Sequence, residues 1–121
     1  MALKRKLLVK GKIIFKTPIV TLSSATVYIK LEDTELADRP AKTIEQVQIR
    51  NIQNIFIEKG YIPFTIYGTI PDKQLMYSVS TLVDLDGDGK VSKGDYINME
   101  NYPVSSINPP TYLTVRVFLV K

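Results

Sequence analysis

Apolar and polar residues alternate along most of this chain, and this period of two constrains the fold more than any other feature of the sequence. Successive side chains of a β-strand point to opposite faces of a sheet, so the alternation predicts strands with one buried face. The pattern occurs in Ala25 to Leu31, Val47 to Ile49, Ile62 to Ile66, Tyr77 to Val83 and Leu113 to Leu119, and a first segment, Leu8 to Phe15, is apolar with interspersed lysines.

Turn-forming residues separate these runs, at 17–18, 38–40, 59–60, 68–72 and 108–110. Short strands with such spacing predict an all-β fold, a single antiparallel β-sandwich of about seven strands. Residues 34–45 or 51–59 leave room for a helical turn, although Pro40 argues against a long helix in the first segment. The chain has 121 residues and no repeat or linker, so we expect one domain spanning residues 1–121.

The composition excludes several kinds of chemistry. The chain has no cysteine and no histidine, which removes disulfides, thiolate sites, the usual general base and the commonest transition-metal ligand. The acids Glu32, Asp33, Glu35 and Asp38 cluster locally, and paired carboxylates can perform acid–base chemistry. A solvated connection rich in acids explains them more simply. We therefore expect a protein that is not an enzyme.

Residues 84–95 read DLDGDGKVSKGD and have the pattern of a calcium-binding loop. Calcium prefers oxygen ligands, and a twelve-residue loop of this type supplies them from positions 1, 3, 5, 7, 9 and 12. Those positions hold Asp84, Asp86, Asp88, the carbonyl of Lys90, Ser92 and Asp95. Gly89 occupies the sharp turn at position 6, and Val91 at position 8 is expected to tie the loop to the body of the protein.

An alternative is that the Asp-Gly pairs at 86–89 form only a hairpin turn. That alternative does not explain Asp84, Ser92 and Asp95 at their offsets, so we favour a metal site. The segment before the loop alternates like a strand, and Pro103 allows at most a short helix after it. The loop is therefore expected to be EF-hand-like but to join strands, which makes the ion structural. Asp95 in place of glutamate weakens calcium binding or admits magnesium.

The first sixteen residues are basic and contain no acid: their charges are Lys4, Arg5, Lys6, Lys10, Lys12 and Lys16. One interpretation is a patch for nucleic acid or an anionic membrane. The other, which we favour, is an exposed strand whose lysines prevent edge-to-edge aggregation. No nucleic-acid partner and no integral membrane segment are expected. The chain as given is expected to be soluble, in the cytoplasm or, after removal of a leader, in the cell envelope.

Several segments resemble a bacterial family, the YbaY-like lipoproteins related to the type III secretion pilotin, a lipoprotein chaperone. The resemblance covers about residues 10–120 and is carried by residues 22–41 (LSSATVYIKLEDTELADRPA), Ile62-Pro63-Phe64-Thr65-Ile66, Tyr77-Ser78-Val79 and Tyr102-Pro103-Val104. It implies a compact β-sandwich with the calcium-type loop as an insertion. In the pilotin branch it also implies a partner, the secretin of a secretion system, escorted to the outer membrane. The acylated cysteine of such lipoproteins has no counterpart in this sequence.

Two functions follow from these patterns. The first is a non-enzymatic calcium-binding β-sandwich module, in which the ion rigidifies a loop between strands. The second is a pilotin-like chaperone or interaction domain that binds a peptide or an envelope protein by strand addition at an exposed edge. The seven tyrosines are expected to serve packing and cross-strand pairing.

Overall fold

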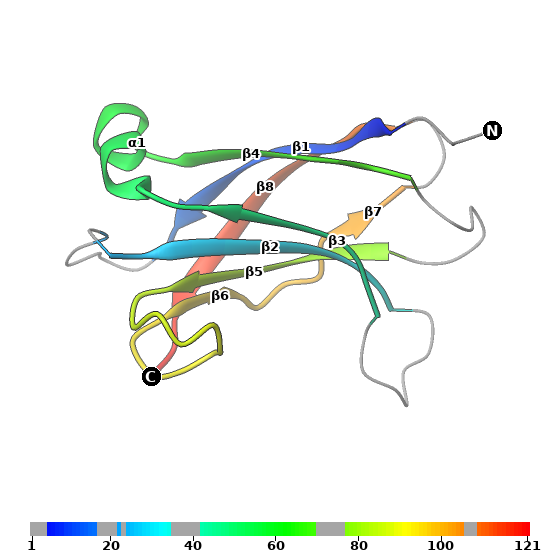
Figure 1. Cartoon of the computed structure of the whole chain (residues 1–121). Helices are drawn as coiled ribbons and strands as arrows, with labels where there is room; N and C mark the ends of the chain where they lie inside the picture. The colour runs from blue at the N-terminus through cyan, green and yellow to red at the C-terminus, as the bar shows by residue number, and fades with distance from the viewer. Residues whose placement is uncertain (1–4, 17–21, 23, 35–41, 70–76, 106–108) are drawn as a thin grey trace.

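The computed structural model describes residues 5–16, 22, 24–34, 42–69, 77–105 and 109–121 (Figure 1). The elements are β1 Lys6–Phe15, β2 Thr26–Asp33, β3 Lys42–Ile49, α1 Ile52–Lys59, β4 Ile62–Gly68, β5 Tyr77–Asp84, β6 Tyr96–Asn98, β7 Pro103–Val104 and β8 Thr111–Leu119. The turns expected at 17–18, 38–40 and 70–72, the residue Asn108, and the residues Lys4, Glu35 and Asp38 lie outside the described part.

The strands of the described residues form one sheet in the order β3-β2-β5-β6-β8-β1-β4, with β7 beside β5. The pairs are antiparallel except β1 and β8, which run parallel from Val9↔Thr111 to Phe15↔Val117. The end strands β3 and β4 contact each other, so the sheet curls into a nearly closed barrel (Figure 1). The all-β prediction is confirmed. The arrangement differs from two facing sheets, because the parallel β1–β8 pair joins the two ends of the chain within a single sheet.

The interior of the barrel contains the apolar side of each alternating run. Eleven described hydrophobic residues have no exposed surface: Val9, Ile13, Val27, Ile29, Leu31, Ile52, Ile62, Ile66, Val83, Val115 and Val117. Aligned residues of neighbouring strands point the same way, and Val27↔Val83 and Ile13↔Val115 are two such pairs within the core. The period of two therefore predicted correctly which residues of β2, β4, β5 and β8 face inward.

Helix α1 links β3 to β4 and packs at one end of the barrel (Figure 1). It follows Asn51, which adopts a left-handed conformation, and ends at Gly60 with φ 77°, where the Gly60 amide donates to the Phe56 carbonyl. The Phe15 ring makes edge contacts with Phe56 of the helix at 5.3 Å and with Tyr96 of β6 at 5.1 Å between centroids. The helical turn expected within 51–59 is confirmed, whereas 42–45 belong to a strand.

No helix in the described part of the chain has the length and apolar character needed to cross a membrane.

Candidate functional site

The acidic loop, residues 84–95, joins β5 to β6 (Figure 1). Asp84 ends β5 and Asp95 directly precedes β6. The end of the loop is fixed to the chain beyond β8, because the Gly94 amide donates to the Val120 carbonyl at 2.9 Å and the Val120 amide donates to the Asp95 carbonyl at 2.8 Å. The setting between two strands agrees with the expectation from sequence. A loop held by strands at both ends cannot transmit a change in the angle between helices.

The two buried aspartates, Asp84 and Asp95, organise the backbone of the acidic loop. Asp84 accepts hydrogen bonds from the amides of Gly87 at 3.0 Å and Gly89 at 2.7 Å. Asp95 accepts from the amides of Leu85 at 2.9 Å and Ser92 at 3.1 Å. Gly87, Gly89 and Gly94 have positive φ, a conformation in which glycine lacks the steric cost of other residues. The loop therefore wraps around its own carboxylates.

The carboxylates of Asp84, Asp86, Asp88 and Asp95 each offer an oxygen, and these oxygens all lie within 4.8 Å of one another. The Ser92 hydroxyl donates to Asp86 at 2.6 Å and to Asp95 at 3.0 Å, so it belongs to the same cluster. Hard cations such as calcium take six to eight oxygens of this kind. The structure thus brings together five of the six residues predicted as ligands.

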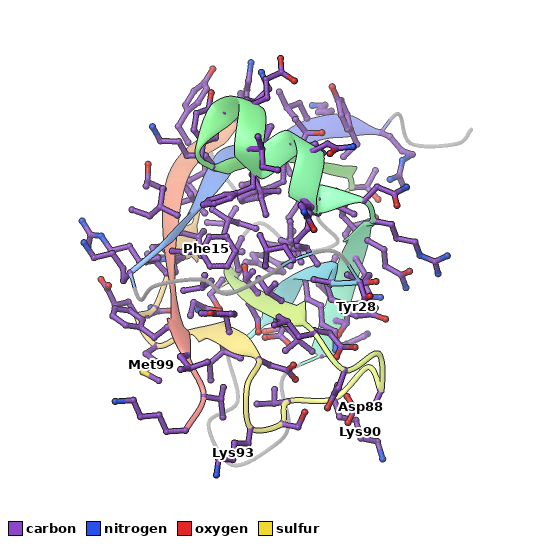
Figure 2. All side chains as sticks on the ribbon, turned by 90° about the vertical axis from the view of Figure 1, so that its left-hand side faces the viewer. Phe15, Tyr28, Asp88, Lys90, Lys93 and Met99 are labelled. Carbon is purple, nitrogen blue, oxygen red and sulfur yellow. The ribbon has the colours of Figure 1, made fainter. Side chains whose placement is uncertain are left out.

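The sixth predicted residue, Lys90, lies at the outer turn of the loop, where its amide donates to Asp88 at 2.9 Å. The side chains of Lys90 and Lys93 point away from the body of the protein (Figure 2). The expectation for Val91 is wrong: its side chain is 56% exposed and does not anchor the loop in the core. The hydrogen bonds from Asp84 and Asp95 and the pairing with Val120 fix the loop instead.

Two carboxyl groups of the acidic loop have shifted pKa values. Burial, followed by the hydrogen bond with Asp86, raises the pKa of Asp84 above its ordinary value of 3.8. The hydrogen bonds from Ser92 and Asp84 lower the pKa of Asp86 to about 2. Concentrated negative charge next to a buried carboxyl is the electrostatic setting that a divalent cation relieves.

A second feature lies beside the acidic loop, on the outer face of β2, β5 and β6. A hollow of about 450 Å³ is bounded by Tyr28 and Lys30 of β2, Ser80 and Leu82 of β5, and Lys90 of the loop. Figure 2 shows Tyr28 on the same side of the molecule as Asp88 and Lys90. The sequence did not reveal this hollow, because its walls come from segments far apart along the chain.

Asn98 also lines the hollow, and it lies on β6 next to the point where the pairing of β5 with β6 ends. Its side-chain oxygen accepts a hydrogen bond from the Thr81 amide at 2.7 Å. Its amide nitrogen donates to the Glu100 carbonyl at 3.0 Å and to the Val79 carbonyl at 3.5 Å. The side chain of Asn98 therefore supplies the hydrogen-bond acceptor that the Thr81 amide lacks in the backbone pairing. No local sequence pattern predicts this role.

The basic N-terminal segment forms β1, and its position corrects the interpretation favoured from sequence. β1 pairs with β4 on one side and with β8 on the other, so it is an inner strand of the sheet. Its lysines therefore do not protect an edge from aggregation. The end strands are β3 and β4.

Comparisons with known proteins bear on the fold. No protein-family model matches this chain, and no curated protein sequence matches it either. A similar solved structure is that of an alternative pilotin from the type II secretion system of Vibrio cholerae. It matches with a TM-score of 0.75 over 98% of this chain and 99% of that chain, at 21% sequence identity. This likeness establishes a pilotin-like fold. The narrower resemblance to YbaY-like lipoproteins and the inserted EF-hand-type loop remain predictions.

Proposed function

We propose that this protein is a non-enzymatic protein-interaction domain of the pilotin type, whose partner is the secretin of its host's secretion system. The observation that carries the proposal is the shared fold, which extends over 98% of this chain and 99% of the pilotin from Vibrio cholerae. The two chains therefore share their architecture over nearly their whole lengths. Fold alone does not define function, so the proposal requires a direct binding test.

The test is a calorimetric titration of the folded protein with purified fragments that tile the host's secretin. We expect one fragment to bind saturably and the remaining fragments to serve as internal controls. Failure of every fragment, with the protein shown to be folded by circular dichroism, would contradict the proposal.

A second proposal concerns the acidic loop: residues 84–95 bind a divalent cation, calcium or magnesium, which rigidifies the connection between β5 and β6. The gathering of four carboxylates with the Ser92 hydroxyl supports it. Asp84, Asp86, Asp88, Ser92, Asp95 and the carbonyl of Lys90 would be the ligands. A ligand that binds only the folded state, at a hundred times its dissociation constant, stabilises that state by about 2.7 kcal/mol.

Calorimetric titration with calcium and then with magnesium tests this second proposal. We expect calcium binding and a higher melting temperature for the natural protein, and neither for the double variant Asp86→Ala/Asp88→Ala, which removes both ligand oxygens. Both aspartates are exposed, so the variant should still fold. Glu58→Gln removes an exposed carboxylate from α1 and is the control, expected to bind like the natural protein. No heat and no change in melting temperature up to millimolar calcium would refute the proposal.

A further inference from the structure

The outer face of β4, β1 and β8 concentrates positive charge. β1 carries Lys6, Lys10 and Lys12, β8 carries Arg116, and none of the three strands contains an acidic residue. The other half of the barrel contains Glu32 and Asp33 on β2, Glu45 on β3 and Asp84 on β5, together with Lys30 and Lys42. The acidic residues of the described strands are therefore confined to that half, whereas β4, β1 and β8 carry only positive charge.

Lys10 and Lys12 point outward from the centre of this face. Both are exposed, while Val9 and Ile13 on either side are fully buried. In the described part of the chain the ion pairs are Arg5–Glu45 and Arg116–Glu100, each at 3.5 Å, and neither lysine pairs with an acid. Two neighbouring cations without counter-charges on an inner strand repel each other, which favours an external anion between them.

Tyrosines flank the two lysines. The register places Lys10 beside Tyr112 and Lys12 beside Pro63. The Lys12 ammonium lies 5.1 Å from the centroid of the Tyr61 ring, and Tyr112 is 72% exposed. A shallow hollow of about 350 Å³ lies here, bounded by Lys10, Lys12, Tyr61 and Tyr112. We call the outward residues Lys10, Lys12, Tyr61, Pro63, Tyr112 and Thr114 the basic face.

We propose that the basic face docks the protein on a bilayer surface rich in anionic phospholipids, with Lys10 and Lys12 contacting phosphates and Tyr112 inserted among the head groups. This goes beyond the proposed interaction with a secretin and does not depend on it. Lysines near an anionic bilayer gain favourable free energy additively, without a fixed geometry. Tyrosine, with an apolar ring and a polar tip, is the side chain enriched at the boundary between lipid and water.

The chemistry of the basic face favours a bilayer over an acidic protein partner. Recognition of a particular carboxylate typically uses the planar fork of arginine, and the basic face contains none; the arginine of β8, Arg116, pairs with Glu100. Lysine is a flexible point charge that adapts to mobile phosphates. Glu32 and Asp33 lie on β2, which is remote from β1 in the strand order, and would face away from the negatively charged membrane, which limits repulsion.

Cosedimentation with large vesicles tests the proposal. At low salt we expect the protein to bind vesicles of phosphatidylcholine containing one quarter phosphatidylglycerol, and not vesicles of phosphatidylcholine alone. About 0.5 M salt should release it, because the screening length falls to a few ångströms. Lys10→Gln/Lys12→Gln should weaken the partition by about 25-fold, since each lysine contributes about fivefold.

The control Lys59→Gln/Lys121→Gln makes the same change in net charge at exposed positions outside the basic face, and it should bind like the natural protein. Lys10→Arg/Lys12→Arg should also retain binding, because the charge is preserved. Tyr112→Ser leaves the charge unchanged and should weaken binding several-fold, which keeps the proposal testable if the lysine variant misfolds. Equal losses in the basic-face and control variants would overturn the proposal. So would binding to poly-glutamate or an oligonucleotide without any binding to the anionic vesicles.

Discussion

Gly11 lies on β1 where the backbone passes close to the interior. A Cβ at this position would lie 2.6 Å from the Leu113 carbonyl oxygen and 2.8 Å from Cζ of the Phe64 ring. Real Cβ atoms do not approach backbone oxygens so closely, so glycine is required here for space and not for an unusual φ. The Phe64 ring occupies the volume that a side chain at position 11 would otherwise fill.

Gly11→Ala is therefore expected to lower the free energy of unfolding by about 1 to 3 kcal/mol, because the neighbouring carbonyl is backbone and cannot swing aside. Urea denaturation measures this change. Thr65→Ala, at an exposed position of β4, should cost less than about 1 kcal/mol. A Gly11→Ala protein as stable as the natural one would show that β1 and β8 are less closely packed than the structure has them.

Asp84 and Asp86 act on stability in separate pH ranges. The raised pKa of Asp84 means that the folded state binds its proton more tightly than the unfolded state, whose pKa is near 3.8. Stability from this group is fully present below that value and is lost as pH rises through the folded pKa. The lowered pKa of Asp86, about 2, acts only between about 2 and 3.8, where stability is lost as pH falls.

With a chelator present, we therefore expect the free energy of unfolding to fall as pH rises from about 4 towards neutrality. Asp84→Asn should flatten this dependence, because asparagine does not titrate. Chemical denaturation at a series of pH values provides the measurement, with Glu58→Gln as a control that keeps the natural slope. A slope unchanged by Asp84→Asn would show that other groups cause the dependence.

At the scale of elements, the pairing of β5 with β6 and β7 is interrupted, and the Asn98 side chain lies in the gap. Backbone pairing covers only Leu82↔Ile97 and Val83↔Tyr96, and β7 pairs further along β5 at Tyr77 and Ser78. Asn98 bridges the intervening stretch through the Thr81 amide and the Val79 carbonyl. The Asn98 side chain and the backbone hydrogen bond from the Val79 amide to the Tyr102 carbonyl at 3.0 Å therefore fill the gap between the two ladders.

Asn98→Ala leaves the Thr81 amide without its partner, which should cost about 1 to 3 kcal/mol of stability. The hydrogen-exchange rate of the Thr81 amide should rise by at least the factor that corresponds to this loss of stability. Asn101→Ala, at an exposed position nearby, is the matched control and should leave that amide protected. Unchanged protection of Thr81 in the Asn98 variant would contradict the bridging role.

At the scale of the whole molecule, no backbone pairing joins the end strands β3 and β4 in the described part of the chain. We call the contact between these two strands the seam. The Glu45 side chain of β3 lies directly against Gly68 of β4. Arg5 pairs with Glu45 at 3.5 Å and donates to the Tyr67 carbonyl at 2.6 Å, so side chains hold the seam in place of a β-ladder. A strand added by a partner, as the sequence suggested, would have β3 and β4 as its available edges.

We expect amides on β3 and β4 that are not paired with β2 or β1 to exchange on the order of tenfold faster, or more, than amides of β2, β5 and β8. Strands paired on both sides open only with larger unfolding events, whereas an end strand loses protection locally. Native-state hydrogen exchange followed by NMR measures each amide. Equal protection throughout β3 and β2 would mean that the seam is closed by hydrogen bonds in solution.

Much of the local structure could be predicted from the sequence. Alternation identifies the inward side of β2, β4, β5 and β8, and of the two segments that leave room for a helical turn, 34–45 and 51–59, the second contains the helix. The offsets within 84–95 predicted which oxygens gather in the acidic loop, and the structure places these aspartates together. These features depend on residues near one another in the chain, whose spacing determines the direction in which their side chains point.

The partners of the strands were decided only in three dimensions. Period-two alternation shows which face of a strand is buried. The backbone groups that form hydrogen bonds are nearly the same in every residue, so they do not specify which strand pairs with which. Nothing local indicates that β1 pairs in parallel with β8 across most of the chain, yet that pairing makes one near-closed sheet and places Lys10 and Lys12 on a strand that is paired on both sides. The sequence by itself determined strands, core positions and the oxygen-rich loop. The tertiary structure decided the barrel, the seam and the basic face, because these depend on contacts between distant segments.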